Sequence, residues 1–401
     1  MPPPASSGDF VYLDHAAATR LRPEVAAAMD KAAAVAFANP SSPHAAGRLA
    51  KRLLEESRER ILGLVGGRTA GAHRDRLIFT SGATEANRLA VLGLAEERPG
   101  WIATSARDHA SLRQAAADLE RRGWQASHIP LGTTGSLDAD AVRQAFAGAG
   151  TSPCLLTVTT VCGQTGIRED LDAIAGLAAE RPGTLIHADA TQAAAWEALD
   201  FARGPATSLA LAPHKFGGPR GIGGLVVRAA ATLRPLTPGP QELGLRGGTE
   251  AVSLAVGFAC GLELAVAERS TATLHVTSLR QRFEREFLAA TAAAGFPATV
   301  IGKDCPRSPH VTAVAITGVD RQTLVMAADL EGVCLATGTA CASGSSEPPA
   351  ILAALGIDAQ LRTSVVRASF SPTLTDEDMT RAIARLKSVF ARLRRSALLG
   401  S

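Results

Sequence analysis

The sequence predicts an α/β protein, in which a large domain with a mostly parallel sheet is followed by a smaller α+β domain. Two observations predict this fold class. Through residues 76–228, short apolar runs alternate with longer alanine-rich stretches. Beyond a Pro/Gly-rich stretch at 235–248, a long helical region is followed by strand-like pieces mixed with helices. Alternation of the first kind is typical of parallel strands whose connecting helices cover both faces of a sheet.

Six strands are predicted in the first part of the chain. They are RLIFT (76–80), WIATS (101–105), CLLTVTTV (154–161), TLIHAD (184–189), SLALA (208–212) and GGLVVR (223–228). Helices are predicted from residue 85 to about 95, over 109–123 and over 168–183. Their many alanines are good helix formers and allow close packing on a sheet.

The second part of the chain mixes helices and strands in a different pattern. A helix is predicted from 249 to about 295 and another from Asp376 onward, with a short helix in PPAILAALG (348–356). Strands are predicted in ATVIG (298–302), VTAVAI (311–316), CLAT (334–337) and SVVRASF (364–370). We therefore expect residues from about 265 onward to form a separate α+β domain.

Composition excludes several classes of protein. The 401 residues are 46% hydrophobic and 20% charged, which supports a sizeable core and excludes wholesale disorder. Lys plus Arg is 41 and Asp plus Glu is 38, a net charge of +3 that is too balanced for a nucleic-acid or anionic-membrane binder. The start of the chain has no leader-like pattern, and no apolar stretch reaches the roughly 20 residues of a membrane helix. We expect a cytoplasmic protein that binds neither nucleic acid nor membrane.

The six cysteines have the spacing of neither a disulfide framework nor a zinc site. No CxxC pair occurs, and we expect no metal. The cysteines therefore predict a reducing compartment, in which a functional cysteine acts as a thiol.

Chemically distinctive residues follow four of the predicted strands. Ser81–Glu85 follows the first, His109 follows the second, Asp189 ends the fourth, and Lys215 follows the fifth. Ligands of open parallel sheets bind at the carboxyl ends of the strands. Taken alone, Ser81–Glu85 is explained equally well as a helix cap, and a lone histidine is more often structural than catalytic.

Together these residues match the needs of pyridoxal phosphate. This cofactor takes an anion cradle, a lysine that forms an imine, a carboxylate for its pyridine nitrogen and a flat group over its ring. Asp189 is the candidate for the pyridine nitrogen and Lys215 for the imine. The other candidates are Ala83, Thr84 and His214 for the phosphate, Gln192 for the phenolic oxygen and His109 for stacking on the ring.

In this order the motifs resemble those of cysteine desulfurases of the NifS/IscS type, in the class V aminotransferase group. The resemblance is carried by VYLDHAAAT (11–19), NPSSPH (39–44), FTSGATEAN (79–87), DHASL (108–112), HADATQ (187–192), PHKFGGPRGIG (213–223), RGGTE (246–250), GTACASGSSEP (338–348) and SVVRASF (364–370). It implies the fold type I of pyridoxal-phosphate enzymes, with a mostly parallel seven-stranded sheet. It also implies an N-terminal arm over 1–14 that packs with the small domain, a large cofactor-binding domain over 15–264 and a small domain over 265–401.

The resemblance also implies catalytic roles. Cys341, in a Gly/Ser-rich loop of the small domain, would attack the sulfur of a substrate L-cysteine, giving alanine and an enzyme persulfide. Lys215 would move the α-proton, and His109 would shuttle a proton. Arg367 would bind the substrate carboxylate with its planar fork. Thr249 would reach the phosphate of the neighbouring subunit's cofactor, which implies a homodimer, and a sulfur-acceptor protein is an implied partner.

Two positions depart from the family pattern. Gly163 stands where an asparagine normally faces the cofactor, and Ala212 stands where a serine normally binds phosphate. These departures leave two alternatives open. One is another pyridoxal-phosphate reaction on the same scaffold, such as a β-lyase, an epimerase or a transaminase. The other is a weakly active scaffold that binds a sulfur-acceptor protein.

Overall fold

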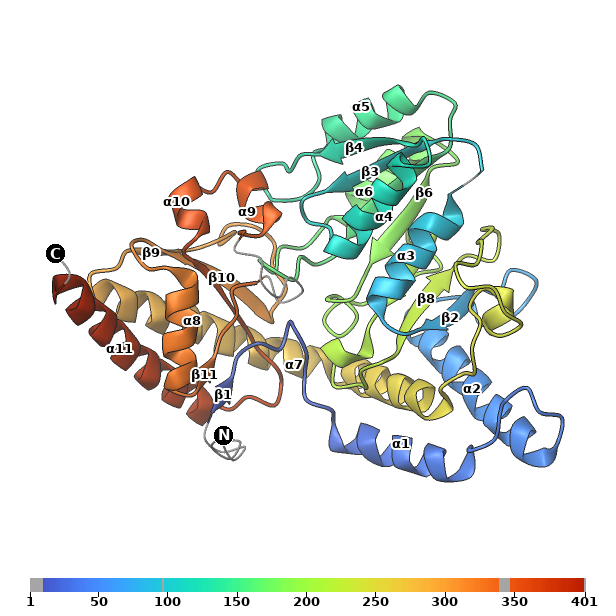
Figure 1. Cartoon of the computed structure of the whole chain (residues 1–401), viewed down its shortest axis with the longest axis horizontal. Helices are drawn as coiled ribbons and strands as arrows, with labels where there is room; N and C mark the ends of the chain where they lie inside the picture. Colours follow the sequence, from blue (N-terminus) through green and yellow to red (C-terminus); the bar gives the residue numbers. More distant parts are fainter. Residues whose placement is uncertain (1–9, 96, 339–346, 400–401) are drawn as a thin grey trace. The chain divides into compact units, whose positions relative to one another are not determined.

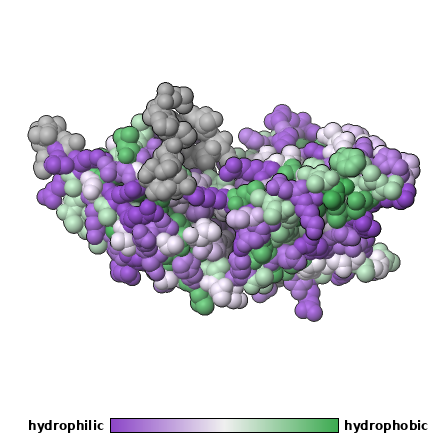
Figure 2. Space-filling view, turned by 90° about the horizontal axis from the view of Figure 1, so that it is seen from below, coloured by the Kyte–Doolittle hydropathy of each residue, from purple (hydrophilic) through white to green (hydrophobic). Residues whose placement is uncertain are grey.

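The computed structural model describes residues 10–95, 97–338 and 347–399, and it divides the chain into two compact units (Figure 1). The large unit comprises residues 19–161 and 169–269, and the small unit comprises residues 1–18, 162–168 and 270–401. On the face drawn in Figure 2, hydrophilic residues predominate and hydrophobic residues are interspersed among them. Within the described ranges, no helix combines the length and the apolar character that a membrane crossing requires.

The large unit contains the predicted mostly parallel sheet, with seven strands in the order β2-β8-β7-β6-β5-β3-β4. Strands β7, β6, β5, β3 and β4 run parallel to one another, whereas β8 runs antiparallel to both β2 and β7. This confirms the predicted fold class. The strands span Arg76–Thr80 (β2), Trp101–Ser105 (β3), Gln125–Ile129 (β4), Cys154–Thr159 (β5), Leu185–Asp189 (β6), Ser208–Leu211 (β7) and Gly223–Val227 (β8).

Alternating side chains of the strands pack on opposite faces of this sheet, as the pleat requires. Leu77 and Phe79 of β2 lie in one apolar cluster, and Ile78 between them lies in another. The first cluster includes Leu54 of α2, and the second includes Leu89 of α3. The helices of the large unit span Pro23–Val35 (α1), Ala45–Leu64 (α2), Ala83–Leu94 (α3), Ala110–Glu120 (α4), Ala139–Ala149 (α5) and Leu171–Glu180 (α6).

The small unit has two sheets of its own. Strands β12 (Val365–Ser369), β10 (Val311–Ile316) and β9 (Ala298–Val300) form an antiparallel sheet, and β1 (Val11–Tyr12) pairs in parallel with β11 (Val333–Cys334). Its helices are α8 (Arg321–Leu330), α9 (Ala350–Ala354), α10 (Ala359–Arg362) and α11 (Asp376–Leu399). Buried phenylalanines form part of its core, and the rings of Phe283 and Phe287 are stacked with their centroids 5.0 Å apart.

The division between the units differs from the predicted boundaries of 1–14, 15–264 and 265–401. Helix α7 (Val252–Ala293) is continuous through the boundary at 269 and 270, so no break in the sequence marks it. Residues 15–18 and 162–168 belong to the small unit. The second segment is held there by backbone hydrogen bonds from Arg168 N to Pro306 O (2.9 Å) and from Ser308 N to Gly166 O (2.8 Å).

Candidate active site

The topology brings the four distinctive segments of the large unit to one edge of the sheet. Strands β7, β6 and β3 share one direction through β5, so their carboxyl ends lie at the same edge. Strand β2 has this direction too, because it is antiparallel to β8 and β8 is antiparallel to β7. Asp189 ends β6, and the segments that follow β2, β3 and β7 contain Ala83, His109 and Lys215. This edge is therefore the candidate site of the large unit.

The turn between β2 and α3 presents a helix N-terminus. Helix α3 has 12 residues, and its N-cap is Gly82, with no side chain capping the first turn. Ala83 and Thr84 therefore offer their backbone N–H groups at the positive end of the helix, where an anion binds favourably. The alternative of a Ser/Thr cap is not what the structure has, since the Glu85 carboxylate accepts a hydrogen bond from Ser81 N (2.6 Å) instead.

A glycine of the neighbouring strand allows this turn to lie close to the sheet. A Cβ atom at Gly223 would come within 2.5 Å of the carbonyl carbon of Gly82. Since such a contact is shorter than van der Waals packing allows, residue 223 needs to be glycine for the turn to keep its place. The GIG part of PHKFGGPRGIG thus supports the shape of the anion cradle.

Asp189 ends β6 with a buried carboxylate. Its side chain accepts hydrogen bonds from Thr191 N (3.0 Å, to Oδ1) and from Asn87 Nδ2 (2.9 Å, to Oδ2). A buried carboxylate is costly unless it is hydrogen-bonded or meets a cation. The nearby Thr191 Oγ1 is buried and has no hydrogen-bond partner within the described ranges, so a bound group could satisfy it.

His214 and Lys215 form a 3-10 turn directly after β7. Thr19 holds this turn, because its N and Oγ1 both donate to the carbonyl of His214 (2.8 and 3.0 Å). Burial, together with the neighbouring cations Lys215 and Arg220, lowers the pKa of His214 to about 4. The His214 imidazole is therefore neutral near pH 7. Ala212, at the departure from the family pattern, is fully buried.

His109 is the N-cap residue of α4. Its Nδ1 accepts a hydrogen bond from Ser111 N (3.2 Å) and lies 2.8 Å from Ser111 Oγ. The residue is exposed, although the turn that carries it is anchored by a buried neighbour. His109 therefore lies at the edge of the sheet, and its buried neighbour holds the turn in place.

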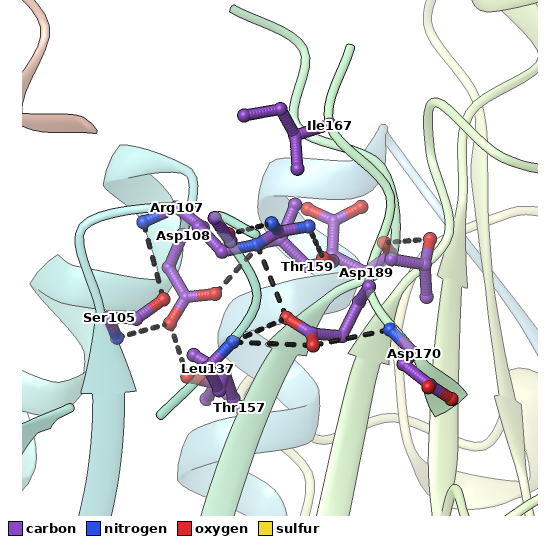
Figure 3. Close-up of polar contacts among 12 residues, drawn as sticks. Ser105, Arg107, Asp108, Leu137, Thr157, Thr159, Ile167, Asp170 and Asp189 are labelled. Carbon is purple, nitrogen blue, oxygen red and sulfur yellow. Dashed lines mark hydrogen bonds and ion pairs between the residues drawn. The ribbon is translucent and has the colours of Figure 1, made fainter. Parts of the chain in front are cut away.

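That anchor is Asp108, which lies among three polar groups in Figure 3. Its carboxylate accepts hydrogen bonds from Ser105 N (2.9 Å), Thr157 Oγ1 (2.6 Å) and Thr159 Oγ1 (2.8 Å). Thr157 and Thr159 belong to β5, so Asp108 ties the turn after β3 to the neighbouring strand. Burial raises the pKa of Asp108, and the three donors oppose that shift.

Gln192 and Thr249 are the two remaining predicted residues of the large unit. Gln192 is half-buried, three residues beyond Asp189 at the same strand end. Thr249 is exposed in the loop that precedes α7. The predicted contact of Thr249 with a neighbouring subunit remains a prediction.

The small unit holds the predicted substrate-binding arginine. Arg367 lies on β12 and is only 5% exposed. Its Nη2 donates to Asp14 Oδ1 at 2.6 Å, and its Nη1 donates to the carbonyl oxygen of Gly163 at 2.9 Å. The backbone of Arg367 also pairs with that of Ala336. The guanidinium is therefore held in a fixed orientation and already binds one carboxylate.

Gln164 has a buried side-chain amide in the same unit. Its side chain is buried, and in the part of the chain that the structure describes neither Oε1 nor Nε2 has a hydrogen-bond partner. It lies against Gly338, where a Cβ atom would be 1.8 Å from Gln164 Oε1. Gly338 has φ +84°, a conformation that favours glycine. The predicted nucleophile Cys341 follows three residues later and lies outside the described residues.

Gly338→Ala is expected to destabilise the small unit by roughly 1–3 kcal/mol, because it adds backbone strain and a clash with Gln164. Urea unfolding of Gly338→Ala, Gln164→Ala and the double variant measures both contributions. In the Gln164→Ala background the cost of Gly338→Ala should fall, since only the backbone strain remains. An equal cost in both backgrounds would contradict the contact.

Sequence reasoning did not find several residues that support the site. Asn87, Ser111 and His187 contact the predicted residues or one another, and Asp14 pairs with Arg367. One signal was available in the sequence. Asn87 is a polar residue on an otherwise apolar helix face, and His187 lies inside the apolar run of a strand.

Comparison with known proteins places these features in a family. The model of the family "Aminotransferase class-V" matches residues 11–381. The chain belongs to the class-V aminotransferase family. A cysteine desulfurase of Cereibacter sphaeroides is 34% identical over 391 residues, covering 96% of each chain. The cysteine desulfurase IscS of Dictyoglomus turgidum is 31% identical over 388 residues, covering 96% of this chain and 95% of that protein.

Solved structures agree with the fold. A NifS-like protein from Rickettsia africae superposes with a TM-score of 0.85 at 23% identity, covering 95% of this chain and 99% of that one. DndA from Streptomyces lividans superposes with a TM-score of 0.71 at 29% identity, covering 90% and 99%. The predicted resemblance to cysteine desulfurases of the NifS/IscS type, and the fold type I that it implies, are confirmed.

The donor set at the sheet edge fits the predicted pyridoxal phosphate. The uncapped N-terminus of α3 suits a phosphate, and Asp189 offers a buried carboxylate that is held in place by two donors. Thr191 Oγ1, which is buried and has no partner among the described residues, is a polar atom that a bound group would satisfy. Within residues 10–95, 97–338 and 347–399, no group of three or more His, Cys, Asp or Glu residues is placed to hold a metal ion.

Proposed function

We propose that this class-V enzyme is a pyridoxal-phosphate-dependent cysteine desulfurase, which converts L-cysteine to L-alanine and passes the sulfur to Cys341 as a persulfide. The assignment of the cofactor is supported by the common edge of the sheet, where Asp189 ends β6 and Lys215 follows the adjacent β7. The observation that carries the desulfurase reaction is Cys341, together with the 34% identity to a cysteine desulfurase along nearly the whole chain.

Each proposed residue has a distinct task in the large unit. Ala83 and Thr84 bind the phosphate through the N-terminus of α3, and the neutral His214 adds a hydrogen bond. Asp189 keeps the pyridine nitrogen protonated, Gln192 binds the phenolic oxygen, and His109 covers the ring. When bound, pyridoxal phosphate supplies the electron sink for bonds at the α-carbon of the amino acid. Lys215 holds the cofactor covalently and moves the α-proton of the substrate.

The sulfur transfer is proposed to use residues of the small unit. Arg367 binds the substrate carboxylate, and the Cys341 thiolate attacks the substrate sulfur. A bond forms between the two sulfur atoms while the bond between sulfur and the substrate β-carbon breaks. The electron pair stays with that carbon, which takes a proton and becomes the methyl group of alanine. A covalent persulfide divides one difficult transfer into two steps.

The proposed setting follows from this chemistry. A persulfide on Cys341 needs an acceptor, for which we propose a sulfur-acceptor protein. A nucleophilic thiol must stay reduced, which suits the cytoplasm. We also propose a homodimer, in which Thr249 reaches the phosphate of the neighbouring subunit's cofactor. The molar mass of the protein in solution, measured for the native chain and for Thr249→Ala, tests this last part.

Product analysis tests the reaction. The purified protein loaded with pyridoxal phosphate is incubated with L-cysteine and dithiothreitol, and alanine, sulfide and pyruvate are quantified. A desulfurase releases alanine and sulfide in equal amounts. Pyruvate and ammonia instead of alanine would indicate a β-lyase, D-cysteine an epimerase, and a keto acid with an aminated acceptor a transaminase. Absence of all turnover would favour the scaffold alternative.

Arg367→Ala is expected to lower kcat/KM for L-cysteine about tenfold to a hundredfold, because a charged hydrogen bond to a carboxylate contributes about 1.5–3 kcal/mol. The dissociation constant of the cofactor should stay the same, since the proposed partner is the substrate. Arg367→Lys keeps a charge opposite Asp14 and serves as the folding control, and Arg392→Ala on α11 is the matched surface variant. An unchanged kcat/KM in Arg367→Ala would exclude this role.

A further inference from the structure

A hydrogen-bond network at the sheet edge of the large unit, buried around Asn87 and partly buried at His109, connects Asp189 with His109. Asn87 Nδ2 donates to Asp189 Oδ2 (2.9 Å) and to Ser111 Oγ (3.1 Å). Ser111 Oγ in turn lies 2.8 Å from His109 Nδ1. On the other side, Asn87 Oδ1 lies 2.9 Å from Nε2 of His187. The Asn87 amide therefore joins the contacts to Asp189 and Ser111 with the contact to His187.

Asn87 occupies a position that packing alone would give to an apolar residue. It is 1% exposed, and its neighbours Ala86, Leu89 and Ala90 on α3 are buried as well. A buried amide without partners would cost free energy, whereas this one has a partner for each of its hydrogen-bonding groups. All hydrogen-bonding groups of its side chain are therefore used within the network.

The direction of each hydrogen bond follows from the donors available. Both N–H groups of Asn87 are used by Asp189 and Ser111, so its Oδ1 must accept from His187. Burial lowers the pKa of His187 to about 4, so its ring is neutral and carries one proton. That proton is on Nε2, and Nδ1 accepts from Ser208 Oγ at 2.8 Å.

The same reasoning fixes the proton on His109. Ser111 Oγ accepts from Asn87, so its own hydrogen is free to point to His109 Nδ1. His109 Nδ1 also accepts from Ser111 N at 3.2 Å. An Nδ1 atom that accepts two hydrogen bonds carries no proton, so neutral His109 bears its proton on Nε2.

We infer that Asn87 is a positioning residue, which aligns the Asp189 carboxylate and, through Ser111, sets His109 as the Nε2–H tautomer. The inference rests on the proposed function in that Asp189 and His109 are the two groups expected to contact the cofactor ring. Its consequence is specific. Nε2 is the only nitrogen of His109 that can give or take a proton during turnover, and Asp189 and His109 depend on the same amide.

Imidazole ¹⁵N NMR spectra of the full-length protein, loaded with pyridoxal phosphate, test the tautomer directly. The resonances of His109, one of nine histidines, are assigned from their loss in His109→Gln. We expect the Nε2–H pattern for His109 in the native chain. Ser111→Ala removes the Oγ contact at 2.8 Å and keeps the backbone donor Ser111 N, so it should weaken this preference without reversing it, while the cofactor dissociation constant changes less than twofold. Asn87→Ala should do the same to the tautomer and raise the dissociation constant about tenfold.

Matched controls separate positioning from folding. Asn39→Ala replaces the other asparagine of the chain, which is exposed, and should change neither the tautomer nor the cofactor affinity. If Asn87→Ala does not fold, as judged by circular dichroism, Ser111→Ala still tests the His109 branch. An Nδ1–H pattern in the native chain, or an unchanged tautomer in Ser111→Ala, would overturn the inference. These spectra are independent of turnover, so failure of the desulfurase assay would be a separate result.

Discussion

Replacing Lys215 by alanine is expected to abolish turnover of L-cysteine, with kcat/KM reduced by at least about a thousandfold. Lys215 lies in the 3-10 turn after β7, and β7 pairs with β6, the strand that ends in Asp189. It has two proposed tasks, the covalent hold on the cofactor and the movement of the α-proton. The visible absorbance of the purified protein should change at the same time, because the covalent link through Nζ is lost.

The control for this prediction is another lysine of the large unit. Lys51→Ala, on the exposed surface of α2, should keep both the absorbance and the turnover of the native chain. Alanine release by Lys215→Ala at the native rate would contradict the assignment. Restoration of part of the activity by an added primary amine would support it, since such an amine can take the place of the missing Nζ.

Cys341→Ser is expected to stop persulfide formation and multiple-turnover desulfuration, while cofactor binding and its absorbance remain native. A hydroxyl is a much poorer nucleophile toward sulfur than a thiolate. The persulfide is measured by labelling with a thiol-reactive probe followed by mass spectrometry of the Cys341 peptide. Sulfide and alanine release at the native rate would show that the reaction does not use the Cys341 thiol as its nucleophile.

Cys260→Ser is the matched control. Cys260 is one of the free cysteines of the described part of the chain, and burial raises its pKa, so its thiol is protonated near pH 7. Its replacement should leave persulfide formation unchanged. The two serine variants together distinguish the loss of one particular thiolate from a general effect of removing sulfur.

The sequence predicted the strands of the large unit well where they are buried. β2 and β3 have the predicted bounds, and both are apolar runs enclosed by helical stretches. β4 (Gln125–Ile129) was not predicted, because only Ile129 of its five residues is buried and no period-two pattern appears. α8 was also missed, since its buried face consists of only a few residues, among them Leu324 and Ala328.

The candidate site was predictable where a chemical group follows a buried strand. Asp189 and Lys215 are conspicuous because a charge directly after an apolar run needs a reason. Asn87 was not predictable in this way. Its partners His187 and Asp189 lie about 100 residues away in the sequence, and only the pairing of strands with α3 brings them together. The ion pair between Arg367 and Asp14 spans 353 residues and has the same cause.

The anion cradle at the turn between β2 and α3 can form during synthesis only after the antiparallel strand β8 has been made. β2 lies at the edge of the sheet, and its sheet neighbour β8 is made nearly 150 residues later, at Gly223–Val227. Until then the turn at Gly82 lacks the surface of Gly223 against which it packs. Contacts this distant in sequence form slowly, and the nascent chain emerges at about 5–20 residues per second. We therefore expect the proposed cofactor to bind only to a large unit in which β8 has already joined the sheet.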